Sequence, residues 1–350
     1  MRRVSRIAVA GVATASLAVA LSACGGSSTD ASTSSSGSGT KGIGLAYDIG
    51  GKGDQSFNDA AFAGIEKADT EFKYTSRDIE PQDGESNADK VQRLENLAKA
   101  GYNPVIGVGY VYAPAVKEVA AKYPKVTFGV IDDEQDKASN VADMVFHEEQ
   151  ASYLAGVAAA KATKKDHIGF IGGVNIPLIH KFEAGFVQGA KSVNPKIQIE
   201  KQYLTETAQE GGFSSPDKGK DAAEGQIEKG ADVVYAAAGL SGQGVIQTAA
   251  AHKIWAIGVD SDQYKQDALA KYKDYILTSA TKDVAGAVYN LAKSVKDGKP
   301  ETGVVRASLA TGGVGLADSN PVFKNNADLQ AALKKAEAGI KDGSITVKTS

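Results

Sequence analysis

The chain has 350 residues, a formal net charge of −3 at pH 7 and a single cysteine. This weak acidity argues against nucleic acid or an anionic membrane surface as a partner. Both attract proteins with more lysine and arginine than acidic residues, and this sequence has fewer. One cysteine excludes an internal disulfide and a cysteine metal cluster, so apolar burial must hold the fold, and the length is enough for two domains.

Residues 1–23 have the pattern of a secretory signal peptide. Arg2, Arg3 and Arg6 form a basic start, and an apolar run follows from Ile7 to Leu21. The run is short and ends in small residues, which is typical of a signal peptide rather than a membrane span. Its end, Leu-Ser-Ala-Cys at residues 21–24, resembles a bacterial lipobox, in which the cysteine is diacylated and becomes the mature N-terminus. The alternative is an ordinary signal peptide with a chance cysteine.

Residues 24–40 are predicted to be the lipidated Cys24 followed by a flexible tether. Residues 25–40 consist almost entirely of serine, glycine and threonine, a composition typical of linkers, and they would span roughly 20–24 Å. Loss of residues 1–23 would remove three arginines and shift the net charge to about −6. We therefore expect a protein held by a lipid anchor on the extracytoplasmic side of the cell membrane.

Past the tether, short apolar runs alternate with segments of helical periodicity. Such alternation is typical of parallel sheets with helices on both faces, and ten strands favour two sheets of five or six over one wide sheet. A last helix over residues 330–340 and a short strand within 343–348 are expected to end the chain. The ten predicted strands are residues 43–47, 74–79, 104–108, 126–131, 141–146, 167–171, 197–203, 231–237, 254–259 and 276–280.

The segment from Asp48 to Asn58, Asp-Ile-Gly-Gly-Lys-Gly-Asp-Gln-Ser-Phe-Asn, is predicted to join the first strand to the first helix. In open α/β sheets, ligands bind beyond the carboxyl ends of strands. Ser56 with Asp59 three residues later has the pattern of a capping box. A carboxylate, the Phe57 ring and an amide would then meet in one crevice. The alternative is that Phe57 belongs to the core and Asn58 caps the helix.

Acidic residues also follow later strands, at Asp132-Asp133 and at Asp260-Ser261-Asp262, and Lys282 follows the last predicted strand. Each aspartate could cap the next helix, but together they could line one cleft. The glycine-rich loop at residues 239–244 fits neither a P-loop nor G-x-G-x-x-G, so it suits an uncharged ligand or a tight turn. The sequence shows no metal-ligand spacing and no nucleophile–base pair, which favours a binding protein without cofactor or metal over an enzyme.

Together these segments resemble the basic membrane protein family of substrate-binding lipoproteins, which includes purine-nucleoside receptors of ABC transporters. The matching segments run in order through nearly all of residues 41–320, and the most specific are Ser-Phe-Asn at 56–58 and Asp-Ser-Asp-Gln at 260–263. Others are Gly-Val-Gly-Tyr at 107–110, Phe-Glu-Ala-Gly-Phe at 182–186 and Ser-Ala-Thr-Lys at 279–282. In this family the glycine loop is often Gly-Gly-x-Gly-x-Gly, and here Leu240 replaces the second glycine.

The resemblance implies an α/β type I periplasmic-binding-protein fold, in which two doubly wound lobes with parallel sheets are joined by three crossovers. The first lobe would comprise residues 41–145 and 283–320, and the second residues 146–282 and 321–350. It also implies ligand contacts from nine residues: Asp48, Phe57, Asn58, Asp132, Phe182, Gly239, Gly242, Asp260 and Lys282.

A nucleoside suits this set of side chains. The two phenylalanines can stack on a base, and Asp48, Asn58 and Asp132 can pair with its edge. Asp260, held by Lys282, can accept hydrogen bonds from two ribose hydroxyls. The carboxylates would repel a phosphate, so nucleotides are expected to be excluded.

We predict a monomeric, non-enzymatic receptor that binds a nucleoside, with a purine as the expected base, and delivers it to the permease subunits of an ABC transporter. One alternative is a receptor for a sugar or another small hydroxylated ligand on the same fold. The other is an enzyme, either a nucleoside hydrolase or a nucleotide-cofactor oxidoreductase.

Overall fold

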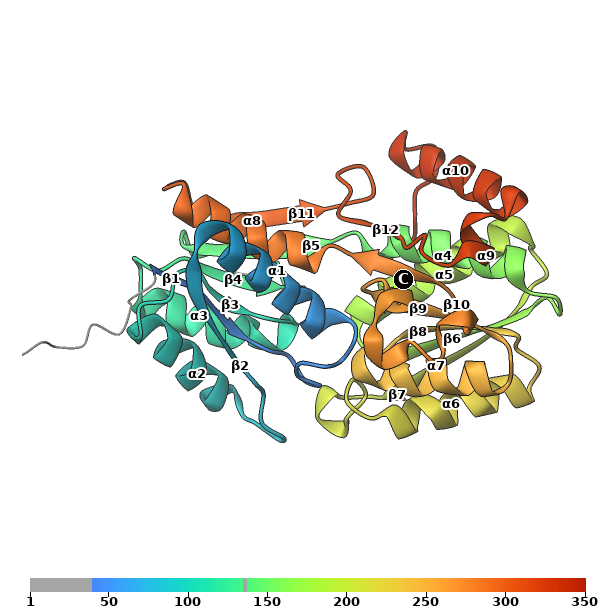
Figure 1. The fold of residues 1–350 in the computed structure, drawn as a ribbon, viewed down its shortest axis with the longest axis horizontal. Coiled ribbons are helices and arrows are strands. Elements are labelled where there is room, and N and C mark those ends of the chain that lie inside the picture. The colour runs from blue at the N-terminus through green and yellow to red at the C-terminus, as the bar shows by residue number, and fades with distance from the viewer. Residues whose placement is uncertain (1–39, 135–136) are drawn as a thin grey trace, which may run out of the picture. The chain divides into compact units, whose positions relative to one another are not determined.

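A computed structural model describes residues 40–134 and 137–350 of the chain (Figure 1). These residues form two six-stranded sheets, in the orders β11-β5-β4-β3-β1-β2 and β12-β10-β9-β8-β6-β7. The prediction of two sheets with five or six strands each is confirmed. The first sheet contains β1 (Thr40–Ala46), β2 (Tyr74–Ile79), β3 (Val105–Gly107), β4 (Phe128–Ile131), β5 (Val141–Phe146) and β11 (Gly303–Ala307).

The second sheet repeats this plan. All of its strand pairs are parallel except β10 with β12, which is antiparallel. It contains β6 (His167–Val174), β7 (Gln198–Thr205), β8 (Val233–Ala237), β9 (Trp255–Asp260), β10 (Ile276–Lys282) and β12 (Val314–Leu316). Two mainly parallel sheets flanked by helices confirm the predicted fold class.

Helices cover both faces of each sheet because successive strand residues point to opposite sides. Leu45 and Ile106 face one core together with α1 and α8, whereas Ala46 and Val105 face another with α2 and α3. The second sheet is covered by α4 and α5 on one face and by α6 and α7 on the other. No helix in the described part of the chain is long and apolar enough to cross a membrane.

The helices of the first lobe are α1 (Phe57–Phe72), α2 (Asn87–Lys99), α3 (Ala113–Lys122) and α8 (Val284–Lys296). Those of the second are α4 (Glu148–Ala162), α5 (Pro177–Val193), α6 (Pro216–Glu228), α7 (Gly242–Ala251), α9 (Pro321–Lys324) and α10 (Ala327–Lys341).

The chain passes between the sheets three times: from β5 into α4, from β10 into α8, and from β11 to β12. Because β12 hydrogen-bonds to β10, it belongs to the second sheet, although the predicted first lobe extends to residue 320. The other lobe boundaries stay predictions. Strands β11 and β12 have no counterpart among the predicted strands, since both are short edge strands without a buried apolar run (Figure 1).

The predicted strand within residues 343–348 is wrong. This segment has no strand partner and lies against α5 and the core, where Ile345 and Val347 pack. The side chain of Gln188 on α5 takes its hydrogen bonds: Nε2 donates to the Thr346 carbonyl at 3.0 Å, and Oε1 accepts from the Lys348 N–H at 2.7 Å. The side chain of Gln188 thus makes the backbone hydrogen bonds that a neighbouring strand would make if this segment were a strand.

Three glycines allow α4 and α5 to approach each other closely. A Cβ at Gly156 would overlap the Phe186 carbonyl oxygen, and one at Gly189 would overlap that of Tyr153. Gly185 meets the Glu149 backbone in the same way. Because α5 carries residues that line the binding cavity described below, this close packing fixes their position.

We expect Gly189→Ala to destabilise the protein by about 1–3 kcal/mol, because the added methyl group forces the two helix backbones apart. The midpoint of urea unfolding measures this. Gly225→Ala is the matched control: Gly225 lies inside α6, and a Cβ built there has no described atom within 4 Å apart from its chain neighbours and the backbone of its own helix. That variant should gain about 0.5–1 kcal/mol from helix propensity. Equal effects from both variants would show that the α4–α5 contact is not tight.

Candidate functional site

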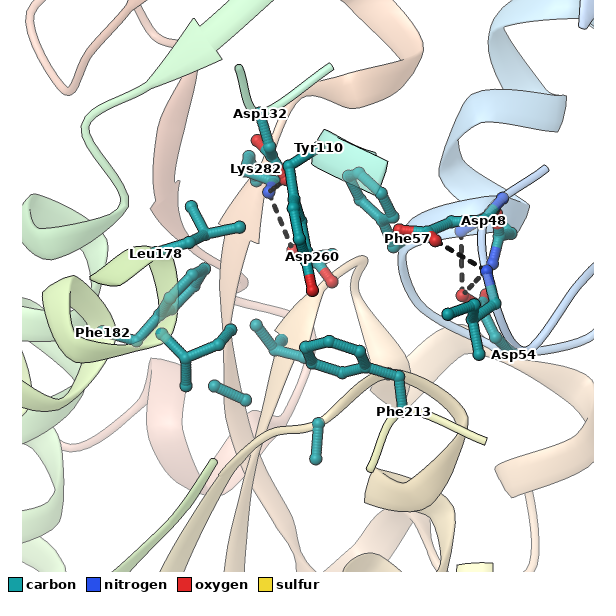
Figure 2. Close-up of a pocket in the computed structure, with 17 residues that line it drawn as sticks. Asp48, Asp54, Phe57, Tyr110, Asp132, Leu178, Phe182, Phe213, Asp260 and Lys282 are labelled. Atoms are coloured by element: carbon teal, nitrogen blue, oxygen red, sulfur yellow. Dashed lines mark hydrogen bonds and ion pairs between the residues drawn. The ribbon is translucent and has the colours of Figure 1, made fainter. Parts of the chain in front are cut away.

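The candidate site is a cavity between the two lobes with about 530 Å³ of space free of protein atoms, a volume that includes open solvent (Figure 2). Eight of the nine predicted ligand contacts line it: Asp48, Phe57, Asn58, Asp132, Phe182, Gly239, Asp260 and Lys282. The ninth, Gly242, does not line the cavity; it begins α7, where a Cβ would make ordinary contact with Ala236.

Other residues that the sequence reasoning did not select also line the cavity. Asp54 lies in the predicted turn between the first strand and the first helix, and Tyr110 ends the Gly-Val-Gly-Tyr segment that resembles the family, so the sequence had marked both positions. Leu178 lies in the first turn of α5. Phe213 follows no predicted strand, and no sequence pattern marks it. Figure 2 shows the rings of Phe57, Phe182 and Phe213 facing the central space from different elements.

Asp54 caps helix α1. Its carboxylate accepts hydrogen bonds from the N–H groups of Ser56 at 2.9 Å, Asn58 at 2.8 Å and Asp59 at 3.2 Å. The predicted capping box of Ser56 with Asp59 is therefore wrong, because Asp54 offers a charged acceptor within reach of all three donors. The Ser56 hydroxyl turns away and donates to Oδ2 of Asp260 at 2.7 Å.

Asn58 links the two acidic residues of this turn. Its Oδ1 accepts from the Asp48 N–H at 2.9 Å, and its Nδ2 donates to Asp54 at 3.1 Å, which leaves one amide hydrogen free of these bonds. The Asp48 carboxylate accepts from the Ile49 N–H at 2.7 Å and lies over Gly109. Gly109 has a φ of +89°, and any side chain there would overlap this carboxylate. The turn at residues 107–110 thus makes room for Asp48.

Lys282 is buried among the carboxylates of both lobes. Its Nζ lies 2.7 Å from Oδ2 of Asp132 and 3.8 Å from Oδ1 of Asp260, so its close partner is Asp132 rather than the predicted Asp260. The ammonium also lies 4.5 Å from the centre of the Phe57 ring, within the range of a cation–π contact. The second oxygen of Asp132, Oδ1, is buried without a hydrogen-bond partner in the described residues, so it remains an acceptor for a ligand donor.

Burial shifts the protonation of these groups. It raises the pKa of Asp48 to about 7, with a further rise from the charge of Asp132. It raises the pKa of Asp54 to about 7 as well, although the N–H groups that this carboxylate accepts act in the opposite direction. The pKa of Asp260 is raised by burial, against the opposing effect of Lys282. Burial disfavours the charge of Lys282, but its acidic neighbours outweigh burial and raise its pKa.

The cavity therefore carries four carboxyl groups and one ammonium. Such a site favours ligands that present hydrogen-bond donors and disfavours phosphate. In the part of the chain that the structure describes, no group of three or more acidic, histidine or cysteine side chains is arranged to hold a metal ion.

Residues 43–349 match the family model of ABC transporter substrate-binding proteins that resemble PnrA, the Bmp family. The chain belongs to this family. The predicted resemblance is confirmed, and so is the prediction that the protein is not an enzyme, because the family consists of substrate-binding proteins of ABC transporters.

Some of the relatives match nearly the whole chain. The ABC transporter nucleoside-binding protein BmpA of Lactococcus lactis is 36% identical, over 97% of this chain and 98% of its own. An uncharacterized lipoprotein of Pyrococcus horikoshii is 33% identical, over 90% and 77%. A solute-binding protein of an ABC transporter system from Aeropyrum pernix has a TM-score of 0.76 at 26% identity, covering 89% of this chain and 94% of its own.

The raised pKa of Asp48 predicts a pH dependence of stability. Between pH 4 and 7 the folded protein holds a proton that the unfolded chain releases, so stability falls as the pH rises through this window. For this group the slope is at most about 1.4 kcal/mol per pH unit. Asp48→Asn should flatten the profile, although Asp54 and Glu148, whose pKa values burial also raises to about 7, still contribute. Urea unfolding of the unliganded protein from pH 5 to 8 measures the slope.

The control for this experiment is Asp274→Asn, because Asp274 is exposed and lies outside the cavity. That variant should keep the wild-type slope. If Asp48→Asn also keeps it, the carboxyl group of Asp48 is ionised throughout this pH range.

Proposed function

We propose that this protein binds nucleosides in the cavity between its lobes and passes them to the permease of an ABC transporter. The observation that carries the proposal is the combination of aromatic rings with buried acceptors in one enclosed space. Three phenylalanine rings face the cavity, and Oδ1 of Asp132 has no hydrogen-bond partner among the residues that the structure describes. The relative from Lactococcus lactis that is named a nucleoside-binding protein supports the same assignment.

In this proposal the base stacks on the rings of Phe57, Phe182 and Phe213. A purine offers two fused rings to these faces, so we propose a purine as the preferred base. Asp48 accepts from N–H groups of the base edge when ionised and donates when protonated, so it can adapt to different bases. Asp260 accepts from the ribose hydroxyls.

A receptor for a free sugar is the second candidate. Asp132, Asp260 and Lys282 would serve hydroxyl groups of any sugar, and this arrangement alone does not require a base. The aromatic rings favour the nucleoside because a base covers them with a flat apolar surface. If ribose bound as tightly as adenosine or inosine, a receptor for free sugars would replace the nucleoside receptor as the proposed function.

We also propose that a lipid on Cys24 anchors the protein on the extracytoplasmic side of the membrane. Cys24, with residues 1–39, lies outside the described part of the chain, so the lipobox pattern and the relatives named as lipoproteins carry this step. Cys24→Ser should move the protein from the membrane fraction to the aqueous fraction. Wild-type protein found mainly in the aqueous fraction would contradict the anchor.

The experiment that tests the function is calorimetric titration of residues 41–350 with purine and pyrimidine nucleosides, ribose and free bases. We expect saturable binding of at least one nucleoside and much weaker binding of ribose or base alone. No binding of any nucleoside at millimolar concentration would end the proposal. A nucleoside monophosphate should bind much more weakly than its nucleoside, because its phosphate meets the carboxylates.

Asp260→Asn should weaken nucleoside binding and reduce the preference for ribose over deoxyribose. The change keeps the volume but replaces one acceptor by a donor that faces the ribose hydroxyls. Loss of a charged hydrogen-bond partner in a desolvated site costs about 2–5 kcal/mol, or roughly 30-fold to several-thousand-fold in affinity. Titration of wild type and variant with adenosine and 2′-deoxyadenosine measures both effects.

Asp274→Asn again serves as the control, since it makes the same chemical change on the exposed surface. If Asp260→Asn binds both ligands as wild type does, then Asp260 does not contact the ribose and the sugar lies elsewhere in the cavity.

A further inference from the structure

The two lobes touch beside the cavity through a set of polar contacts between residues of the chain itself. One side is the pair Gln55 and Ser56, directly before α1. The other side is Asp260, the last residue of β9, with Ser261 and Gln263 directly after it. We refer to these five residues as the closure contact. Three direct hydrogen bonds join its two sides: Gln263 Nε2 to Gln55 O at 3.0 Å, Ser261 Oγ to Ser56 O at 2.7 Å, and Ser56 Oγ to Asp260 Oδ2 at 2.7 Å.

Asp260 sits in a strained turn within this contact. The Ser261 N–H donates to the Val259 carbonyl at 2.7 Å, and Asp260 between them has a φ of +62°. A γ-turn with positive φ at its centre is the rare, strained form, and strain of this kind persists only where the surroundings hold it. On the first-lobe side, Gln55 also has a positive φ, of +58°. Two strained segments thus face each other across the contact.

Gln263 holds this turn from the second lobe. Its Oε1 accepts from the Val259 N–H at 3.0 Å, and its own N–H donates to Ser279 Oγ at 3.1 Å. Its side chain is 2% exposed. A Cβ at Gly258 would overlap its Oε1, so the strand makes room for this amide. Gln263 does not line the cavity, and it can influence a ligand only through the residues that it holds.

We propose that Gln263 is a positioning residue that couples the contact between the lobes to the orientation of the Asp260 carboxylate. Its amide bonds both the strained turn in one lobe and the Gln55 carbonyl in the other, so separation of the lobes removes one of the bonds that fix the turn. The same separation removes the Ser56 hydroxyl from Asp260. Closure of the two lobes therefore fixes the Asp260 carboxylate in its place in the cavity. Opening of the lobes frees this carboxylate to move, which favours release of the ligand. The proposal rests on the proposed function in taking Asp260 as a ligand contact.

The test is Gln263→Met, which keeps the length of the side chain but removes both amide bonds. We expect the dissociation rate of the tightest-binding nucleoside to rise at least 10-fold, while its association rate changes less than 3-fold. The preference for adenosine over 2′-deoxyadenosine should fall. Small-angle scattering should give the unliganded variant a larger radius of gyration than unliganded wild type, because one bond between the lobes is lost.

Thr278→Val is the matched control. Thr278 is 2% exposed, and its Oγ1 donates to the Ala317 carbonyl at 2.7 Å within the second lobe. This variant loses a buried hydrogen bond, and with it some stability, but no bond between the lobes. Its dissociation rate and radius of gyration should match those of wild type. If it raises the dissociation rate as much as Gln263→Met does, the effect of Gln263 is general destabilisation and the proposal fails.

Ser261→Ala provides a second variant if Gln263→Met does not fold. It removes only the hydroxyl that donates to the Ser56 carbonyl, and it should shift the dissociation rate and the radius of gyration in the same direction. Wild-type values for the variant that folds would overturn the proposal. If wild type binds no nucleoside, the proposed function fails by itself, while scattering of the unliganded proteins still tests the closure contact.

Discussion

The ion pair between Lys282 and Asp132 is the interaction on which the rest of the site depends. Lys282 ends β10 of the second sheet and Asp132 follows β4 of the first, and both side chains are at most 5% exposed. Charges buried this deeply are tolerated only when they are paired, and loss of one partner leaves the other uncompensated. Because the partners come from different sheets, this ion pair exists only while the lobes are together. The pair therefore ties the chemistry of the site to the arrangement of the lobes.

The backbone around the cavity stores strain at the same strand ends. Asp132 and Asp260 have φ values of +68° and +62°, a region that residues other than glycine rarely adopt. Both turns direct a carboxylate toward Lys282. Its Nζ lies 2.7 Å from Oδ2 of Asp132 and 3.8 Å from Oδ1 of Asp260. Non-glycine residues in this region cluster at binding sites, where neighbouring contacts hold them. The cost in backbone energy is offset here by ionic and hydrogen-bonded contacts that a relaxed turn could not make.

Sequence periodicity predicted ten of the twelve strands in the described residues. Eight of them are inner strands that are buried along most of their length, and the edge strands β2 and β7 were predicted although they are partly exposed. Periodicity missed β11 and β12, which are edge strands with little burial. The strand ends also led to three of the four carboxyl groups of the cavity, since Asp48, Asp132 and Asp260 lie at the ends of buried strands. The sequence could not show that Lys282 lies closer to Asp132 than to Asp260, because distances between segments from two lobes depend on how those lobes meet. For the same reason Ser56 was taken for a helix cap, whereas its partner is more than two hundred residues away.

The acceptors of the cavity come from both lobes, and this constrains what can hold the lobes together. Asp48 and the unpartnered oxygen of Asp132 belong to the first lobe, and Asp260 belongs to the second. A ligand with donors at one end only would contact the acceptors of one lobe alone. If it left Oδ1 of Asp132 unpaired, the cost would be about 1–3 kcal/mol, because this buried oxygen has no hydrogen-bond partner among the described residues. On the proposed function, the base meets the first lobe and the ribose meets the second. The intact nucleoside then satisfies both sets at once, whereas a free base or free ribose satisfies one, so selectivity follows from closure rather than from any single contact.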